Sequence, residues 1–416
     1  MNDLGFLARV FPPTWTIGHL ADVTSKIGSG ATPRGGSTVY IDEGPAFIRS
    51  QNVYDNEFRS DGLAHLTEDA ADQLRGVTVE PNDVLINITG DSILRTCLVP
   101  GYVLPARVSQ HVAIVRSNGR VVPGFLQKWL SLPAMKDFML GHSAGGTRKA
   151  ITKGHLLSFP LPLPPIEEQQ AIAVTLGALD DKIESNRRSV RLIEKLLVSE
   201  FQKLLCKEPI EYRRLSDLAT ITKGVSYKSV DLQTSTTSLV TLKSFDRKGG
   251  YKVDGLKQYI GPYKPQQVIQ PGEVVVAQTD LTQGAEVVGR AVRVPADSSA
   301  DVLVASLDLA IVRPTSEITL EYLLGLLIDE AFREHCRSRT SGTTVLHLAG
   351  DAIPSYMAPI ASASSQESFS TLSRPLLAKA DSLNTETVEL ATLRDALMPE
   401  LLSGRIRVPE ANEAIA

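Results

Sequence analysis

Pro164–Leu205 reads PPIEEQQAIAVTLGALDDKIESNRRSVRLIEKLLVSEFQKLL and carries the clearest structural signal in the chain. Its apolar side chains recur at alternating spacings of four and three residues, the heptad pattern of a helix that packs lengthwise on a partner. About 40 residues at about 1.5 Å each predict a rod about 60 Å long. Asn186 lies on this seam, where it is either a buried polar group that fixes the register or a solvated edge residue. The predicted seam consists of Ile172, Leu176, Leu179, Ile183, Asn186, Val190, Ile193 and Leu197.

A fainter copy of this helix returns 197 positions later, so that Leu204 aligns with Leu401. We expect the second helix from near Gln366 to Ser403, with Pro375 either bending its first turns or marking where its regular part begins. Two such apolar stripes predict an antiparallel pair, the alternative being two amphipathic helices docked on separate domains. The second stripe consists of Leu376, Ala380, Leu383, Leu390, Leu397 and Leu401.

The same offset holds upstream, where Ala113–Arg116 aligns with Ala310–Arg313. Two similar globules of mixed α/β (α+β) fold are therefore expected, joined by the two long helices, with a strand order that the sequence leaves open. The expected division is residues 1–163, 164–206, 207–357 and 358–408. The predicted strands are Gly44–Val53, Asp83–Ile88 and Val108–Val115, then Leu239–Leu242, Glu273–Gln278 and Leu307–Val312; each set precedes a predicted helix, Pro123–Leu140 and Leu320–Arg337.

Composition excludes several classes of protein. The chain has 416 residues, of which 43% are hydrophobic and 22% charged, as in ordinary globular proteins. No apolar run is long enough to cross a bilayer and the first residues lack a signal-peptide pattern, so we expect a cytoplasmic protein. Three widely spaced cysteines and seven histidines form no metal-type grouping. We expect no metal and no disulfide framework.

Motifs for catalysis are also missing. The sequence has no GxxxxGK[ST] phosphate loop and no Asn/Asp-Pro-Pro-aromatic segment of the kind that an amino-methyltransferase needs. Basic residues outnumber acidic ones in Val84–Lys153 and again in Tyr212–Lys264, although the net charge of the chain is −4. Such positive regions hold phosphates in nucleic-acid-binding proteins, and ordinary solvated surface charge is the alternative.

Loops of both globules carry side chains suited to DNA. Arg and Lys pair with guanine, Asn and Gln pair with adenine, and Ser and Thr hold phosphates. For any one of them, an ordinary surface residue is the alternative. The candidates are Arg34, Arg49, Gln51, Asn52, Thr89, Ser92, Arg95, Thr147, Arg148 and Lys149 in the first globule, and Lys223, Tyr227, Lys228, Lys243, Gln278, Thr279, Gln283, Arg337, Arg339 and Thr343 in the second.

With the repeat and the helices established, the chain resembles the specificity (S) subunits of type I restriction–modification enzymes over essentially its whole length. The two helix motifs are specific, whereas the globules match in layout more than in residues. The second helix departs from the family pattern, because Met357–Ser368 lacks the Pro-Pro-x-Glu-Glu-Gln start. The family-like segments are PLPPIEEQQAIAVTLGALDDKIESN (Pro162–Asn186), LRDALMPELLSGRIRV (Leu393–Val408), the strands Asn82–Ile86 and Gly272–Val276, and the turns Gly145–Thr147 and Ser341–Thr343.

The resemblance implies two target-recognition domains, each reading one half of a bipartite asymmetric site in double-stranded DNA, and a coiled-coil spacer that sets the gap. It further implies that two modification (methyltransferase) subunits dock on the helices. Restriction subunits are possible further partners. S-adenosylmethionine, Mg²⁺ and ATP would belong to those partners, so this chain would be non-catalytic.

Two other functions compete with this one. A solitary S-like scaffold or decoy would bind methyltransferase subunits without productive DNA reading, and its complex would show no sequence-dependent methylation. An autonomous DNA-modifying enzyme would need a catalytic motif that the sequence lacks, and methyl transfer by the isolated chain would be its sign.

Overall fold

A computed structural model describes residues 11–141, 150–246, 250–252, 255–280, 284–295, 300–343 and 345–408. Chain contacts separate two compact units, unit 1 (Met1–Lys182 with Leu390–Ala416) and unit 2 (Ile183–Glu389). This division cuts across both long helices, whereas the predicted four-segment division separates the helices from the globules. Each helix therefore contributes residues to both units.

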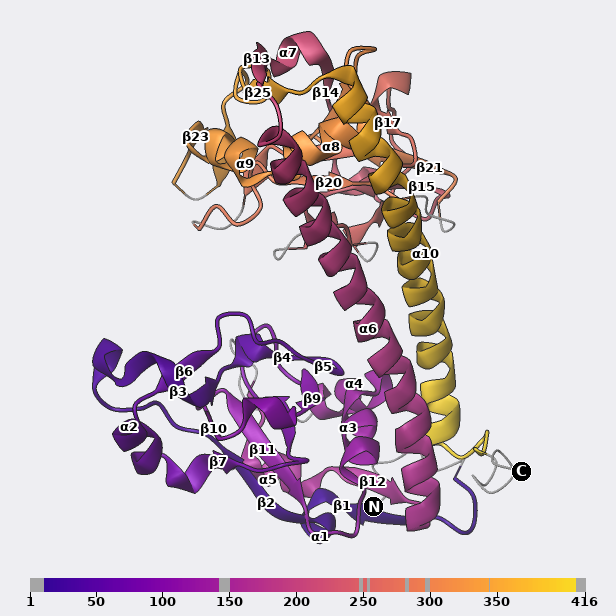
Figure 1. Ribbon diagram of the computed structural model, residues 1–416. Helices are drawn as coiled ribbons and strands as arrows, with labels where there is room; N and C mark the ends of the chain where they lie inside the picture. Colours follow the sequence, from indigo (N-terminus) through magenta and orange to yellow (C-terminus); the bar gives the residue numbers. More distant parts are fainter. Residues whose placement is uncertain are drawn as a thin grey trace. The chain divides into compact units, whose positions relative to one another are not determined.

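Unit 1 is built on two four-stranded sheets (Figure 1). The first, fully antiparallel sheet has the order β2 (Thr24–Ser29), β11 (Val112–Ser117), β8 (Val84–Asn87), β9 (Thr96–Leu98). The second has the order β6 (Ala64–Leu66), β3 (Tyr40–Ile48), β10 (Ala106–Val108), β7 (Thr78–Val79), in which β3 and β10 run parallel. Two-stranded pairs are β1 (Thr16–His19) with β12 (Pro160–Leu163) and β4 (Val53–Tyr54) with β5 (Glu57–Phe58); short helices are α1 (Leu20–Val23), α2 (Glu68–Gln73) and α5 (Lys153–Ser158).

Unit 2 repeats both four-stranded sheets of unit 1. Its first sheet has the order β14 (Ala219–Lys223), β22 (Leu309–Pro314), β18 (Val274–Ala277), β20 (Ala291–Arg293). Its second has the order β16 (Lys257–Gln258), β15 (Thr237–Val240), β21 (Val302–Ala305), β17 (Val268–Ile269), with β15 and β21 parallel. Pairing of β13 (Glu211–Arg214) with β25 (Met357–Ile360) matches β1 with β12, and α7 (Leu215–Leu218) matches α1; the sheet β19 (Thr279–Asp280), β24 (Leu346–Leu348), β23 (Thr340–Ser341) is an addition.

Side-chain contacts repeat along with the strands. Arg116 donates from Nε and Nη2 to the buried carboxylate of Asp83, and Nη2 also reaches the Thr78 carbonyl oxygen. Arg313 makes the same set of bonds to Glu273 and to the Val268 carbonyl. The predicted fold class, mixed α/β with two similar units and two long helices, is confirmed.

Glycine is required at one equivalent position of each unit. A Cβ on Gly30 would lie 1.8 Å from the Val108 carbonyl oxygen, and one on Gly224 would lie 2.0 Å from that of Ser306. Both glycines instead donate a backbone hydrogen bond to the first residue of the neighbouring strand, Val112 or Leu309. Two backbones pass closely here, which leaves no room for a side chain.

Four predicted strands begin or end differently. The predicted strand Gly44–Val53 ends at Ile48, before the 3-10 turn Ser50–Asn52, and the predicted strand Leu239–Leu242 begins at Thr237 and ends at Val240. Val108–Val115 is not one strand, because β10 ends at Val108 and β11 begins at Val112. Val112 N–H donates to the Ser109 carbonyl at 3.0 Å and closes a turn between the two sheets. The predicted strand Leu307–Val312 likewise begins only at Leu309, after the equivalent turn.

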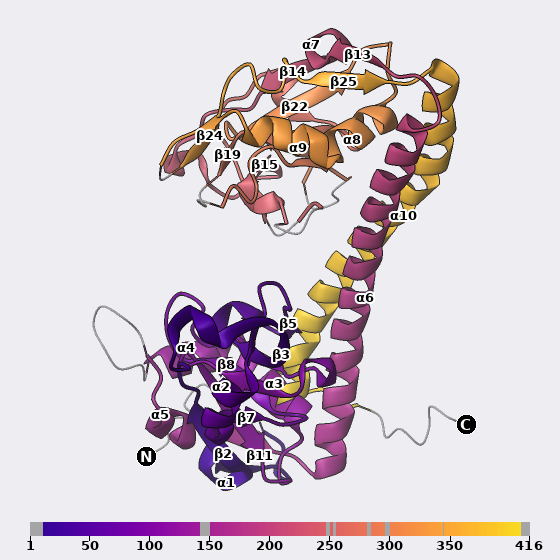
Figure 2. The same cartoon turned by 60° about the vertical axis from the view of Figure 1, so that its left-hand side comes forward.

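Both helices predicted after the third strand are broken. The first is α3 (Pro123–Ser131) and α4 (Pro133–Gly141), because Leu132 takes an extended ψ of 127° before Pro133. The second is α8 (Leu320–Ile328) and α9 (Glu330–Arg337), divided at Asp329, whose ψ is 143°. α8 packs against β20 and β22, on one face of their sheet (Figure 2).

The long helices are α6 (Ile166–Leu205) and α10 (Ala363–Leu402). They run antiparallel within each unit: in unit 2 Asn186 Nδ2 donates to Glu386 at 2.9 Å and the Phe201 and Phe369 rings lie 5.6 Å apart, while in unit 1 Arg394 donates to Asp180 at 2.8 Å. Every position of both predicted stripes is buried or half-buried.

The structure decides between the alternatives for one residue of each long helix, Asn186 in α6 and Pro375 in α10. Asn186 is only 2% exposed, so it is a buried polar group and no solvated edge residue. α10 begins at Ala363, well before Pro375, so the proline does not mark the start of the regular helix. A proline inside a helix removes one main-chain hydrogen bond, which neighbouring turns tolerate at an exposed position such as this.

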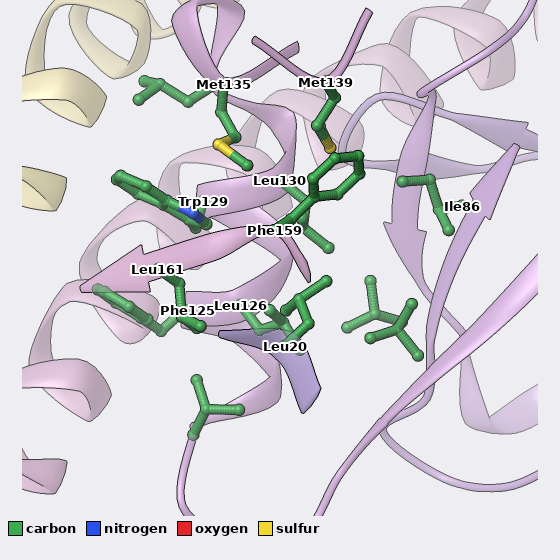
Figure 3. Packing of buried hydrophobic residues seen from close by; sticks show 14 of the residues in the cluster. Leu20, Ile86, Phe125, Leu126, Trp129, Leu130, Met135, Met139, Phe159 and Leu161 are labelled. Carbon is green, nitrogen blue, oxygen red and sulfur yellow. The ribbon is translucent and has the colours of Figure 1, made fainter. Parts of the chain in front are cut away.

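The core of unit 1 joins segments from both ends of the chain. Figure 3 shows Trp129, Met135, Met139 and Phe159 gathered with Leu20, all of them nearly or completely inaccessible. The same cluster contains residues from α10, namely Met398, Leu401 and Leu402. The end of the second long helix is thus part of the first hydrophobic core.

Candidate nucleic-acid interface

In unit 1 the strands of both sheets end at a common edge. β2, β3, β8 and β10 all end there and β11 begins there, since Val108 pairs with Ile48 and Val112 with Asn87. We call the segments that leave these strand ends (residues 30–35, 49–52, 88–95 and 109–111) the loop edge of unit 1. The structure brings seven of the predicted DNA-binding residues to this edge: Arg34, Arg49, Gln51, Asn52, Thr89, Ser92 and Arg95.

Asn87 ties two of these segments together. Its side chain is fully buried, and Nδ2 lies 2.9 Å from the Ser50 carbonyl, 3.3 Å from that of Val53 and 3.1 Å from Ser92 Oγ. A buried amide that loses such partners costs free energy, so these bonds fix both loops. Our sequence prediction missed Asn87 because it follows three apolar strand residues.

A stack of charged and aromatic groups adjoins this point. The Arg59 guanidinium carbon lies 3.7 Å from the centroid of the Tyr54 ring and that of Arg95 lies 4.5 Å from it. Arg59 also donates to both carboxylate oxygens of Glu57. The cation–π contact holds the long Arg95 side chain in one place. A guanidinium group in a fixed position can contact one particular group of a ligand, whereas a mobile one contributes only general positive charge.

The segment 49–52 divides into outward and inward side chains. Gln51 is exposed, while Arg49 is half-buried and donates to the Gly62 carbonyl at 2.6 Å. Asn52 is completely buried: its Oδ1 accepts from Arg49 N–H, and its Nδ2 donates to the carbonyls of Arg59 and Asp61. The prediction that Asn52 reads a base is therefore withdrawn, because its amide is used to build the loop.

A chain of polar contacts crosses the same edge. Thr32 Oγ1 donates to Gln110 Oε1 at 2.7 Å, Gln110 Nε2 lies 3.1 Å from His111 Nε2, and His111 Nδ1 lies 2.6 Å from Thr89 Oγ1. All three contacts are made by exposed or half-exposed residues. Gln110 and His111 were missed, because the sequence placed them in the middle of a strand.

Unit 2 has an equivalent loop edge, formed by residues 224–228, 241–244, 278–280 and 306–308. Lys223, at the end of β14, and Lys228 and Lys243 are exposed here, and Tyr227 accepts a hydrogen bond from Lys257 at 3.1 Å. Gln278 is half-buried and Thr279 is 8% exposed. Ser244 is the buried counterpart of Asn52, since it accepts from Thr241 N–H as Asn52 accepts from Arg49.

The threonines of the two edges are also equivalent. Thr89 contacts His111 in unit 1, whereas Thr279 Oγ1 donates to Asp308 Oδ1 at 2.8 Å in unit 2. His111 and Asp308 both lie directly before the central strand of their sheet, β11 or β22. The position is the same and its chemistry differs.

The remaining predicted residues divide into two groups. Arg337, on α9, is half-buried and donates to the Ala285 carbonyl at 3.1 and 3.2 Å, so much of its guanidinium is occupied within unit 2. Arg339 and Thr343 are exposed on either side of β23, whose neighbour β24 pairs with Thr279. Thr147, Arg148, Lys149 and Gln283 lie outside the described residues.

Charge at both edges is available to a ligand. Five exposed basic residues among the predicted ones form no ion pair with any residue that the structure describes: Arg34, Lys223, Lys228, Lys243 and, next to β23, Arg339. Unpaired cations beside hydroxyl and amide groups are the composition of a phosphate- and base-contacting surface. The described residues contain no group of three His, Cys, Asp or Glu side chains placed to hold a metal ion. None of the described helices is both long and apolar enough to cross a membrane.

The sequence of this fold matches a known family. Residues 12–195 match the model described as type I restriction modification DNA specificity domain. Over these residues, unit 1 and the first part of α6 are similar in sequence to that family of DNA specificity domains. The matched region runs from the start of the described chain into α6, so it includes the whole loop edge of unit 1 and the predicted seam residues as far as Ile193.

Similar proteins bear related names. The putative type I restriction enzyme MjaX specificity subunit of Methanocaldococcus jannaschii is 32% identical over 190 residues, which cover 44% of this chain and 41% of the relative. The EcoBI specificity subunit of Escherichia coli is 31% identical over 154 residues, 35% of this chain and 31% of the relative. The MjaIX specificity subunit of Methanocaldococcus jannaschii is 22% identical over 438 residues, 96% of this chain and 95% of the relative.

A solved structure shares the fold over nearly the full length. The S subunit of a type I restriction–modification system from M. genitalium matches with a TM-score of 0.55 and 14% identity, covering 96% of this chain and 98% of that one. The resemblance to specificity subunits predicted from the helix motifs is confirmed. The two more identical relatives are matched over less than half of their own length, so the activity and partners of the whole chain are matters of proposal.

Proposed function

We propose that this chain is the DNA-sequence-recognition subunit of a type I restriction–modification complex and performs no catalysis itself. The observation that carries the proposal is the pair of equivalent loop edges. Each unit presents hydroxyl, amide and basic side chains where the strands of two sheets end, on a fold shared with a specificity subunit. Phosphate contacts position a protein on DNA, and contacts to base edges select the sequence.

Each loop edge reads one half of a bipartite site in this proposal. The edges are equivalent in backbone and unequal in side chains: Gln51 corresponds to Lys243, Arg34 to Lys228 and His111 to Asp308. Unequal side chains on equal scaffolds support two half-sites of different sequence. The presence of two similar units supports two contact regions on one DNA duplex, because a protein that recognised DNA with a single surface would need only one such unit.

The long helices set the gap between the half-sites and bind two methyltransferase subunits. Support for the first role comes from their continuity, since α6 and α10 each run through parts of both units without a break. Support for the second role comes from apolar side chains that the helix pair leaves exposed, including Val174 (70%) and Leu192 (55%). S-adenosylmethionine, Mg²⁺ and ATP are assigned to the partner subunits.

The test is a map of methylated adenines. The full chain is expressed with its methyltransferase subunits in a host that lacks other adenine methylation, and modified positions are read by sequencing. We expect one bipartite asymmetric motif with a fixed gap. A stable complex that methylates without sequence preference, or not at all, would instead support the scaffold or decoy function. Methylation by the chain without partners would contradict the non-catalytic assignment.

A further inference from the structure

We infer that the turn Gln110–His111 in unit 1 and its counterpart Leu307–Asp308 in unit 2 select different base pairs in the two half-sites. The inference rests on the proposed function and deepens it, because it assigns part of the sequence difference to two named positions. Neither turn belongs to the residues that the sequence alone suggested.

The two turns have the same backbone. Ser109 N–H donates to the Ile48 carbonyl at 2.9 Å and Ser306 N–H donates to the Val240 carbonyl at 3.0 Å, which ties each turn to the parallel neighbour strand. Each serine carbonyl then accepts from the first residue of the next strand, at 3.0 Å and 2.9 Å. A side chain at the first turn position is exposed in both units, as Gln110 or as Leu307 (41%).

In unit 1 the contacts orient the Gln110 amide so that it can form two hydrogen bonds with one base. Thr32 holds its Oε1, and its Nε2 is directed at His111 Nε2. An amide nitrogen only donates, so His111 Nε2 accepts and the proton of the neutral ring lies on Nδ1, donated to Thr89. Gln110 keeps one N–H and one lone pair free. That combination matches N7 and the N6 amino group of adenine in the major groove.

In unit 2 the same turn presents opposite chemistry. Leu307 offers only an apolar surface, which suits the methyl group of thymine. Asp308 uses Oδ1 to accept from Thr279, and no described residue donates to its Oδ2. A carboxylate on an edge with Lys223, Lys228 and Lys243 repels phosphate, so it fits a DNA surface where it faces a base amino group such as N4 of cytosine.

The equivalent threonines take opposite roles for the same reason. Thr89 accepts a hydrogen bond from His111, so its own hydroxyl proton remains available for a bond to DNA. Thr279 instead donates its hydroxyl proton to Asp308. His111 and Thr32 are positioning residues for Gln110 in this scheme, and Thr279 positions Asp308. Exchange of the turns should therefore change base preference at the base pairs that each turn faces, one for Gln110 and up to two for Leu307 and Asp308, and leave the other base pairs unchanged.

The experiment exchanges the turns. The full chain, a Q110L/H111D variant and an L307Q/D308H variant each bind a pool of duplexes of randomised sequence, and the bound fraction is sequenced. We expect each variant to change the preferred base at one or two positions of one half-site, by roughly tenfold to a hundredfold in relative enrichment, with the other half-site unchanged. Arg120→Ala is the matched control: Arg120 is exposed beyond the other end of β11, about 20 Å along the strand, and should change no preference.

The outcomes separate the inference from the proposed function. If the unaltered chain enriches a bipartite sequence and both exchange variants enrich the same sequence, the turns do not read bases and the inference is overturned. If the unaltered chain enriches no sequence, the proposed function falls as well. Should an exchange variant fail to fold, Gln110→Ala removes only an exposed side chain; it must lose preference at a single base pair, and a uniform loss across all sequences would contradict the assignment. His111→Ala should weaken that same preference and leave total binding to the pool nearly unchanged.

Discussion

The arginine and carboxylate that brace the two sheets recur in both units. Asp83 has no exposed side-chain area and receives two hydrogen bonds from Arg116, and Glu273 receives two from Arg313. Each arginine also binds the carbonyl of the short strand β7 or β17 in the second sheet. One side chain thus links two sheets, in the same way, in each half of the chain.

Removal of this arginine should be costly. Arg116→Ala leaves the Asp83 carboxylate buried without its charged partner, so we expect the free energy of unfolding of unit 1 to fall by roughly 3 kcal/mol. Chemical denaturation followed by circular dichroism measures the change. Arg405→Ala is the control, because its pair with Glu400 lies at the surface and should contribute less than about 1 kcal/mol. Equal effects of the two substitutions would contradict this account.

Glu194 on α6 gives a pH-dependent signal. Burial raises the pKa of its carboxyl above the ordinary value of 4.5, although Arg290 and the Gly250 amide oppose this. A raised folded-state pKa contributes stability that is complete below 4.5 and is lost as the pH rises through the folded pKa. Compared with Glu194→Gln, the unaltered protein should therefore become relatively less stable from acidic to neutral pH.

Urea midpoints at several pH values test this expectation. Glu167→Gln, an exposed position on the same helix, controls for the general effect of removing a carboxylate. A difference between Glu194→Gln and the unaltered protein that stays constant over the acidic range would show that burial does not govern this carboxyl.

Elements differed in how well the sequence predicted them. The long helices were predicted to within a few residues at each end, because a heptad pattern over this length has no competing explanation. The apolar strands Val84–Asn87 and Val274–Ala277 were also predicted. Turns were not, since Ser109–His111 looks like strand and only the pairing of β10 and β11 in different sheets reveals the change of direction.

Burial explains the errors in the candidate interface. Asn52 and Gln51 are neighbours with the same type of side chain, yet one is enclosed by its loop and the other is exposed. Gln110 and His111 show the reverse error, because a strand assignment hid two accessible polar groups. Residue type predicts what a side chain can bind, whereas exposure depends on the fold of the whole unit.

Asp329, at the break between α8 and α9, caps the N-terminus of α9. Asp329 accepts from Ala331 N–H at 2.9 Å and from Gln202 Nε2 at 3.0 Å. Asp329→Ala removes the helix cap and leaves Gln202 without this bond, so we expect unit 2 to lose about 1–2 kcal/mol of stability in thermal unfolding. Glu330→Ala, the adjacent exposed position, should lose less than about 1 kcal/mol, and a larger loss there than at Asp329 would refute the capping role.

At the scale of the molecule, the proposal that the helices set the gap between the two half-sites rests on the repeated unit and on the two continuous helices. Matched insertions of seven residues in α6 after Lys182 and in α10 before Leu390 preserve both stripes. They should lengthen the gap of the recognised DNA by about 10 Å, or about three base pairs, without changing either half-site. A methylation map of the variant complex measures the gap.

The control for that map is a matched pair of conservative exchanges, Lys182→Arg with Glu389→Asp, which keep the helix length. The gap should then equal that of the unaltered complex. A longer helix pair with an unchanged gap would mean that something other than α6 and α10 sets the spacing.

Residues from the end of α10 complete the core of unit 1, and this has a consequence for synthesis on the ribosome. Trp129 and Leu176 emerge long before Met398, Leu401 and Leu402, with which they are buried. Until the end of α10 has been synthesised, the first half of the nascent chain exposes hydrophobic surface that is buried in the complete protein. A nonsense mutation that removes only the last few turns of α10 would thus damage the half of the protein that was made first.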